Sequence, residues 1–104
     1  MQVHFVYMTA GSKEEAGSLG KMLVQSKLAA CVNIIDGMNS IYLWDGEIQD
    51  DTEVILIAKT KTDLVPELID KVRERHSYEC PCIVSLPVSA GNPAFLEWIV
   101  KSVK

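Results

Sequence analysis

The sequence is short of basic residues and has no long apolar run. Its 10 Lys and Arg residues are outnumbered by 14 Asp and Glu residues, which gives a formal charge of −4. Because binding to nucleic-acid phosphates or to an anionic membrane requires a basic surface, we expect no nucleic-acid partner and no membrane partner. No apolar stretch approaches the ~20 residues of a membrane-spanning helix, and the first residues lack the basic leader of a signal peptide.

Cysteine is also scarce, and its number is odd. Three cysteines in 104 residues do not suit the disulfide framework of a small secreted protein, so we expect a cytoplasmic location. Hydrophobic residues make up 48% of the chain and charged residues 23%, a balance typical of a folded globular protein rather than a disordered one. The length suits one domain, which we expect to occupy residues 1–104.

Residue patterning predicts elements in the order β-α-β-β-α-β, followed by a C-terminal helix. Strands are expected at 2–9, 30–44, 47–60 and 82–88, and helices at 13–27, at 62–76 and from 93 onward. The helix starts are marked by three signals: a Ser12-x-x-Glu15 capping box, Thr62-Asp63, and Asn92 before Pro93. With right-handed crossovers this order gives an α+β, ferredoxin-like sandwich, with two helices on one face of an antiparallel sheet.

Two glycines interrupt the first predicted helix. Gly17 and Gly20 weaken it by about 1 kcal/mol each relative to Ala. We interpret both as positions where the helix packs closely on the sheet. The prolines around the last strand, Pro81 and Pro87, predict that this strand lies at an edge of the sheet.

The central hairpin is longer than the helices that would cover it. Asp45-Gly46 predicts its turn because both positions tolerate positive φ, and residues 36–39 predict a bulge in the outgoing strand. Fifteen residues of strand extend about 50 Å, whereas fifteen residues of helix extend about 22 Å. The extended hairpin should therefore project beyond the helices, although its tip carries five apolar side chains: Ile41, Tyr42, Leu43, Trp44 and Ile48.

The return strand gives a second indication that one chain cannot bury all of its apolar side chains. Residues 54–58 are apolar at every position, whereas a strand that is covered on one face alternates apolar with polar residues. We expect both faces of this strand to be buried, and the chain has enough helix for only one. Further copies of the chain in a closed ring would cover the other face. The alternative is that the C-terminal helix folds beneath the sheet and covers it alone.

Residues able to bind a metal gather near position 80. In Cys80-Pro81-Cys82 the two thiols point the same way on an extended segment, and with His76 and Glu79 they could converge on Cu(I) or Zn(II). The alternative is two incidental thiols, because no fourth ligand lies at a recognisable spacing.

Other candidate residues have structural explanations. The acidic run from Asp50 to Glu53 is interpreted as a solvated edge, and Cys31 as a small buried apolar residue. Four aromatic side chains fit either a ligand pocket between subunits or anchors of an interface: Tyr42, Trp44, Tyr78 and Trp98. The sequence shows no Ser-His-Asp arrangement and no glycine-rich phosphate loop, so we expect no enzyme.

Five segments of the chain together resemble one known family. They are residues 30–34 (Ala-Cys-Val-Asn-Ile), 40–48 (Ser-Ile-Tyr-Leu-Trp-Asp-Gly-Glu-Ile), 53–60, 76–79 (His-Ser-Tyr-Glu) and 91–99. In this order they resemble the CutA family, the divalent-cation tolerance proteins, over nearly the whole chain. The resemblance implies a cytoplasmic homotrimer of ferredoxin-like subunits, similar in build to the PII signal-transduction proteins. It also implies a link to tolerance of copper and other divalent metals.

The resemblance sorts the candidate residues. Eight of them fall on family positions, which implies a shared cleft between subunits: Cys31, Tyr42, Trp44, Lys59, His76, Tyr78, Glu79 and Trp98. Cys80 and Cys82 depart from the family pattern, where Val and Glu are expected, so a metal site that includes them would be peculiar to this chain.

Two functions follow as hypotheses. The first is a non-enzymatic trimeric protein that requires no cofactor and weakly binds copper or another divalent cation at the inter-subunit cleft. Its predicted ligands are His76, Glu79, Cys80 and Cys82. The second is a PII-like sensor or adaptor that binds an anionic small molecule near Lys59 and signals to an unknown protein partner.

Overall fold

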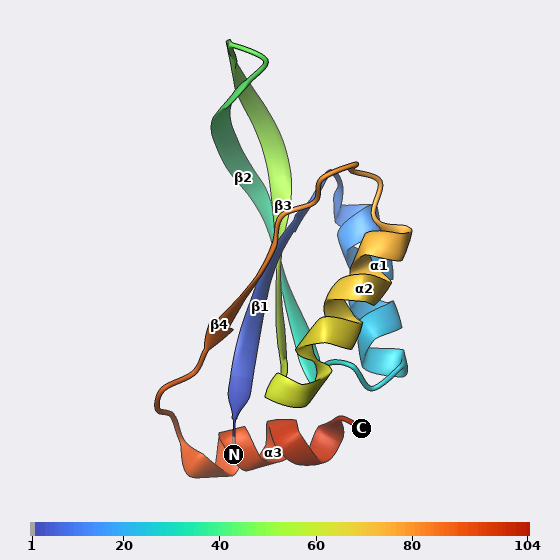
Figure 1. Cartoon of the computed structure of the whole chain (residues 1–104), viewed down its shortest axis with the longest axis vertical. Coiled ribbons are helices and arrows are strands. Elements are labelled where there is room, and N and C mark those ends of the chain that lie inside the picture. The colour runs from blue at the N-terminus through green and yellow to red at the C-terminus, as the bar shows by residue number, and fades with distance from the viewer. Residues whose placement is uncertain (1) are drawn as a thin grey trace.

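A computed structural model describes residues 2–104 and shows an α+β, ferredoxin-like fold (Figure 1). The strands are β1 (Val3–Ala10), β2 (Cys31–Trp44), β3 (Glu47–Lys61) and β4 (Ile83–Pro87). The helices are α1 (Lys13–Gln25), α2 (Val65–Arg75) and α3 (Pro93–Ser102), and a 3-10 turn, Thr62–Leu64, precedes α2. The element order and the fold class predicted from the sequence are both confirmed.

The four strands form one antiparallel sheet in the order β2-β3-β1-β4. β1 lies between β3 and β4, with Phe5 opposite both Lys59 and Leu86. β4 is an edge strand, as its prolines predict, because a proline cannot donate a hydrogen bond to a neighbouring strand. β2 forms the other edge and continues with β3 into the long hairpin.

The hydrophobic core lies between one face of the sheet and helices α1 and α2. Val6 and Met8 of β1 and Leu56 of β3 meet Leu23 of α1 and Leu68 of α2, and all five side chains are fully buried. Figure 1 shows α1 and α2 side by side on this face, while α3 crosses the lower end of the sheet. The periodicity of apolar residues therefore predicts this layer correctly.

The second face of the sheet is only partly covered. Ile55 and Ile57 of β3 are half-buried, so one chain covers only one face of residues 54–58 fully, as expected, and cover of the other face by further copies stays a prediction. Val84, which lies in the cross-strand row of Tyr7 and Ile57, is 49% exposed, and Leu86, two residues further along β4, is 56% exposed. α3 buries Ile99 at the lower end but leaves these side chains uncovered, so it does not cover the face alone.

The β2–β3 hairpin extends beyond the helices as a free arm (Figure 1). Asp45 and Gly46 form its turn with φ values of 51° and 79°, and the strand register shifts between Ile35 and Met38, at the predicted bulge. The arm is defined here as residues 38–53. Its tip exposes Ile41, Leu43 and Ile48 by 70%, 68% and 75%.

The predicted helix starts meet with different outcomes. Ser12 Oγ accepts a hydrogen bond from the Glu15 N–H at 3.1 Å, and Asn92 Oδ1 accepts one from the Ala94 N–H at 3.2 Å, so both are N-caps as predicted. The prediction at Thr62-Asp63 is wrong. These residues lie in the 3-10 turn, and α2 begins after Leu64, which provides no side-chain cap.

The two helical glycines also differ. A methyl group at Gly20 would lie 3.4 Å from a Val32 side-chain carbon, so close packing of α1 on β2 is confirmed there. At Gly17 a methyl group would meet no atom within 4 Å, so the same interpretation is wrong for that position. α1 ends at Gln25, two residues before the predicted end, and Lys27 takes a positive φ of 61°.

Candidate functional site

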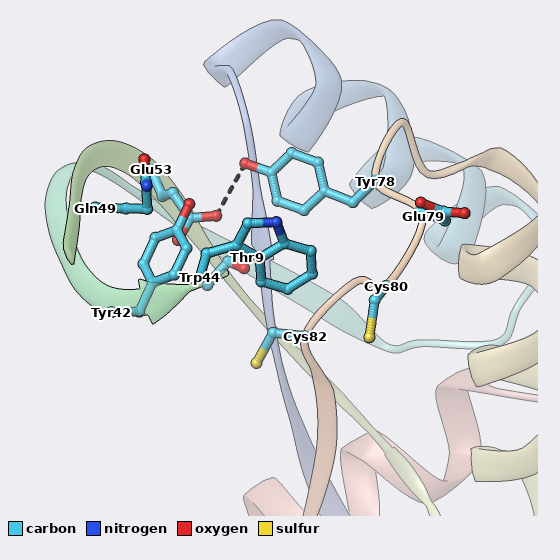
Figure 2. Close-up of a pocket in the computed structure, with 9 residues that line it drawn as sticks. All are labelled: Thr9, Tyr42, Trp44, Gln49, Glu53, Tyr78, Glu79, Cys80 and Cys82. Carbon is cyan, nitrogen blue, oxygen red and sulfur yellow. Dashed lines mark hydrogen bonds between the residues drawn. The ribbon is translucent and has the colours of Figure 1, made fainter. Parts of the chain in front are cut away.

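A cavity of about 500 Å³ lies between the arm and the segment that joins α2 to β4 (Figure 2). β1 contributes Thr9, and the arm contributes two aromatic side chains, an amide and a carboxylate. The segment before β4 contributes the remaining four residues. The full lining is Thr9, Tyr42, Trp44, Gln49, Glu53, Tyr78, Glu79, Cys80 and Cys82. This cavity is called the arm pocket below.

A carboxylate–phenol pair closes one side of the arm pocket. The Tyr78 hydroxyl donates to Glu53 Oε2 at 2.9 Å (Figure 2). The Ser40 hydroxyl donates to Glu53 Oε1 at 2.5 Å. Burial, followed by the hydrogen bond to Glu53, raises the pKa of Tyr78 to about 12. The phenol therefore stays protonated at physiological pH and links the segment before β4 to the arm.

The aromatic residues of the arm lie across the arm pocket from Tyr78. The Tyr42 hydroxyl donates to Asp51 Oδ2 at 2.6 Å, and this bond is the main reason why the pKa of Tyr42 is raised. Trp44, two residues further along β2, remains 59% exposed although it lines the arm pocket. The arm pocket therefore offers the apolar ring of Trp44 as a binding surface, together with the carboxylates of Glu53 and Glu79.

His76 supports the segment that carries Tyr78. Its side chain is fully buried, Nε2 lies 2.7 Å from the Thr9 carbonyl oxygen, and Nδ1 accepts from the Tyr78 N–H at 3.0 Å. A carbonyl oxygen only accepts, so Nε2 carries the proton and Nδ1 is the acceptor. Both ring nitrogens are therefore occupied within the chain.

The sequence matches the protein family described as "CutA1 divalent ion tolerance protein" over residues 4–102. The chain belongs to the CutA1 family. This confirms the resemblance read from the sequence. The relatives include the divalent-cation tolerance protein CutA of Thermus thermophilus, 45% identical over 90% of this chain and 91% of the relative. Another is CutA of Archaeoglobus fulgidus, 43% identical over 97% of this chain and 98% of the relative.

Solved CutA1 structures share the fold. The structure from Oryza sativa has a TM-score of 0.97 at 38% identity and covers 100% of this chain and 95% of its own. The Thermus thermophilus structure has a TM-score of 0.95 at 41% identity, with 98% and 99% covered. The chloroplastic CutA of Arabidopsis thaliana is 40% identical, and this chain spans about half its length, 54%.

The names of CutA1 relatives place them in more than one compartment. The plant relative is described as chloroplastic, and the Archaeoglobus fulgidus structure as that of a periplasmic protein. A cytoplasmic location for this chain therefore stays a prediction. Within residues 2–104, every helix is too short or too polar to cross a membrane.

The four predicted metal ligands of this CutA1 chain do not gather into one site. Glu79, Cys80 and Cys82 line the arm pocket, whereas His76 is buried behind it with both nitrogens occupied. Throughout the described part of the chain, no group of three or more His, Cys, Asp and Glu side chains is arranged to hold a metal ion. A complete ligand set would need a contribution from outside this chain.

The predicted cleft residues of the CutA1 chain divide among three places. Tyr42, Trp44 and Tyr78 line the arm pocket. Lys59 lies on the partly covered face of the sheet, where Nζ donates to Cys31 Sγ at 3.3 Å and to Asn33 Oδ1. Trp98 lies on α3, stacked on Phe95 with ring centroids 5.8 Å apart.

Sequence reasoning missed three residues of the arm pocket: Thr9, Gln49 and Glu53. Asp50 and Asp51 are exposed, as the interpretation of a solvated edge predicts, but Glu53 turns its carboxylate to Tyr78 and Ser40. Glu53 could have been found from its position next to Val54, because Val54 is buried and marks where β3 leaves the arm and enters the part of the sheet that the helices cover.

Proposed function

We propose that this protein is a non-enzymatic, homotrimeric member of the divalent-cation tolerance family, and that it binds a divalent cation weakly at the arm pocket. In this proposal the arm of one subunit lies on its neighbour and converts each arm pocket into a cleft between subunits. A cytoplasmic location fits the three cysteines, which are all free.

The exposed arm is the observation that supports assembly. Ile41, Leu43 and Ile48 are each at least 68% exposed at its tip. Full burial of such side chains stabilises a protein by ~1.5–3 kcal/mol each, so a second copy that covers them gains several kcal/mol. A closed ring gives every arm the same cover, which an open chain of subunits does not.

The chemistry of the arm pocket supports a weakly bound cation. Glu53 and Glu79 bring carboxylates to its lining, and the Tyr78 hydroxyl holds Glu53 in place. Carboxylate oxygens bind hard divalent cations, but such ions need more ligands than one chain gathers. Ligands from a neighbouring subunit or from water would complete the shell, and weak affinity follows from that shared, partly hydrated site.

Sedimentation equilibrium and isothermal titration test the two parts of this proposal. We expect a mass three times the 11.5 kDa of the chain at low micromolar concentration. Titration with Zn(II) is expected to give weak binding that Glu79→Gln reduces. The matched control is Glu97→Gln on α3, where the carboxylate pairs only with Lys101. A mass of one chain, or equal heats for both variants, would contradict the proposal.

One observation favours a second candidate, a sensor of an anionic small molecule. Lys59 is only 8% exposed, and among residues 2–104 no carboxylate lies within 4.0 Å of its Nζ. A buried ammonium with only neutral partners attracts an anion. A thermal-shift screen distinguishes the candidates, because a ligand at 100 times its Kd adds ~2.7 kcal/mol of stability. Stabilisation by anionic metabolites and not by Zn(II) would favour the sensor.

A further inference from the structure

Two free thiols stand on one short segment at the border of the arm pocket. Cys80 and Cys82 flank Pro81 just before β4, both are exposed, and both line the arm pocket. Pro81 fixes its own φ and disfavours a helical conformation at Cys80, which lies in a bend. Because the two cysteines are only two positions apart, their α-carbons lie at most about 7 Å from each other.

The segment is held in place on both sides of the cysteine pair. On one side, the Tyr78 N–H donates to the buried ring of His76 at 3.0 Å. On the other side, the Thr9 N–H donates to the Cys82 carbonyl oxygen at 3.4 Å, directly before Ile83 enters β4. Figure 2 shows both thiols beside this segment, at the border of the arm pocket. Since both residues line one cavity and are close in the chain, we expect side-chain rotation to bring the two sulfurs to a single ion.

The number and type of ligands limit which ion fits. Thiolate sulfur prefers soft ions, and structural zinc needs four ligands, while calcium and magnesium need six or more oxygens. Among residues 2–104 no third His, Cys, Asp or Glu side chain joins these two thiols in a metal-binding group. A soft ion that is satisfied by two sulfurs in a linear arrangement is Cu(I).

We propose that Cys80 and Cys82 of a single chain bind one Cu(I) ion as a two-coordinate bis-thiolate. Binding forms two Cu–S bonds and releases the two thiol protons to solvent, so the site changes from neutral to a net charge of −1. The copper oxidation state does not change.

This site borders the arm pocket of the proposed function but does not depend on it. It uses one chain, a soft monovalent ion and two side chains, whereas the proposed cleft uses carboxylates and neighbouring subunits. Failure of trimer formation or of Zn(II) binding at Glu79 therefore leaves the thiol site intact. Likewise, failure of Cu(I) binding would leave the proposed trimer and its divalent-cation site intact.

Anaerobic titration with Cu(I) in competition with a chromophoric chelator tests the site. The wild-type protein is expected to bind one Cu(I) per chain, with an ultraviolet thiolate-to-copper charge-transfer band. Cys80→Ser and Cys82→Ser should each lower the affinity by more than the roughly 10–100-fold that loss of an outer-shell partner causes. The matched control is Cys31→Ser, which removes the third thiol, at the start of β2 beside Lys59.

Protection from alkylation gives a second readout that needs no variant. One equivalent of Cu(I) should protect Cys80 and Cys82 from iodoacetamide and leave the reactivity of Cys31 unchanged, as measured by peptide mass spectrometry. Equal loss of affinity in Cys31→Ser, an unchanged affinity in both other variants, or alkylation of the cysteine pair in the presence of Cu(I) would overturn the proposal.

Discussion

Glu15 joins two distant parts of the chain through one carboxylate. Its Oε1 accepts from the Gly11 N–H at 3.1 Å and from the Ser77 hydroxyl at 3.0 Å, and its Oε2 accepts from the Ser77 N–H at 2.8 Å. In the predicted capping box, Glu15 would return to the Ser12 N–H. The observed bonds instead fix the start of α1 to the segment that carries Tyr78 and the cysteine pair.

These bonds set the ionisation of Glu15. Burial alone raises its pKa, but the hydrogen bonds from Ser77 and Gly11 outweigh burial and lower the pKa of Glu15 from its ordinary value. A carboxylate whose pKa is lower in the folded state stabilises the protein above its unfolded pKa. That contribution is lost as the pH falls through the folded value.

Glu15→Gln should therefore destabilise the protein in a pH-dependent manner. We expect the free energy of unfolding at pH 7 to fall by about 2 kcal/mol, because the amide replaces charge-assisted hydrogen bonds by neutral ones. The difference from wild type should shrink as the pH falls from the ordinary pKa of a glutamate through the lower pKa of folded Glu15, because the unfolded chain takes up the proton first. Urea denaturation at pH 7 and pH 3.5 measures both values. Glu14→Gln, at the exposed neighbouring position, is the control and should show neither effect.

At the scale of elements, the glycine in helix α1 and the glycine in the turn of the arm have different roles. Gly17 lies in α1 with open space around it, whereas Gly46 has a φ of 79° in the hairpin turn. Alanine reduces the entropy of the unfolded chain at both positions, but only Gly46 requires a backbone conformation that alanine avoids.

Gly17→Ala should raise the free energy of unfolding by about 1 kcal/mol, and Gly46→Ala should lower it by about 1 kcal/mol. Gly20→Ala is the comparison within the same helix: its methyl group would contact Val32 at 3.4 Å, where α1 packs closely on β2, so its gain should be smaller than that of Gly17→Ala. Chemical denaturation of the three variants at one fixed protein concentration measures the differences. If Gly17→Ala and Gly46→Ala changed the free energy of unfolding in the same direction, the backbone conformations of the two glycines would not explain their effects.

The sequence predicts elements better than it predicts their contacts. Strong local signals, such as the Asp45-Gly46 turn and the Asn92 cap, identify structure because the residues that act on each other are neighbours in the chain. The turn at Thr62–Leu64 was missed because Thr62 and Asp63 suit an N-cap equally well. Likewise, Gly17 and Gly20 look alike in the sequence and differ only in what faces them in the fold.

At the scale of the whole molecule, the arm is the largest feature that one chain leaves uncovered. Trp44→Asp places a charge where we propose an apolar contact between subunits. We expect association to weaken by ~100-fold, equivalent to about 2.8 kcal/mol, and measure it by sedimentation equilibrium over a range of concentrations. Lys71→Asp, on the exposed surface of α2, is the matched control. An unchanged distribution of masses for Trp44→Asp would argue against arm-mediated assembly.

The candidate site combines residues that the sequence predicts with contacts that it does not predict. Tyr42, Trp44, Tyr78, Glu79, Cys80 and Cys82 were all proposed as candidates, and the fold brings them to one cavity. His76 was proposed as a ligand, but its role depends on Thr9, which lies 67 positions away and reaches it only through the sheet. Glu53 was interpreted as solvated because its partner Tyr78 lies 25 positions away in the chain. Long-range contacts such as these leave no local pattern.

In the proposed trimer, the arm would also make the stability of each subunit depend on the abundance of the protein. One chain cannot bury the tip from Ile41 to Ile48, which extends beyond α1 and α2. If a second copy covers the tip, that cover obeys mass action and increases with concentration. At low abundance the apolar tip would stay longer in water, where such surfaces favour non-specific aggregation.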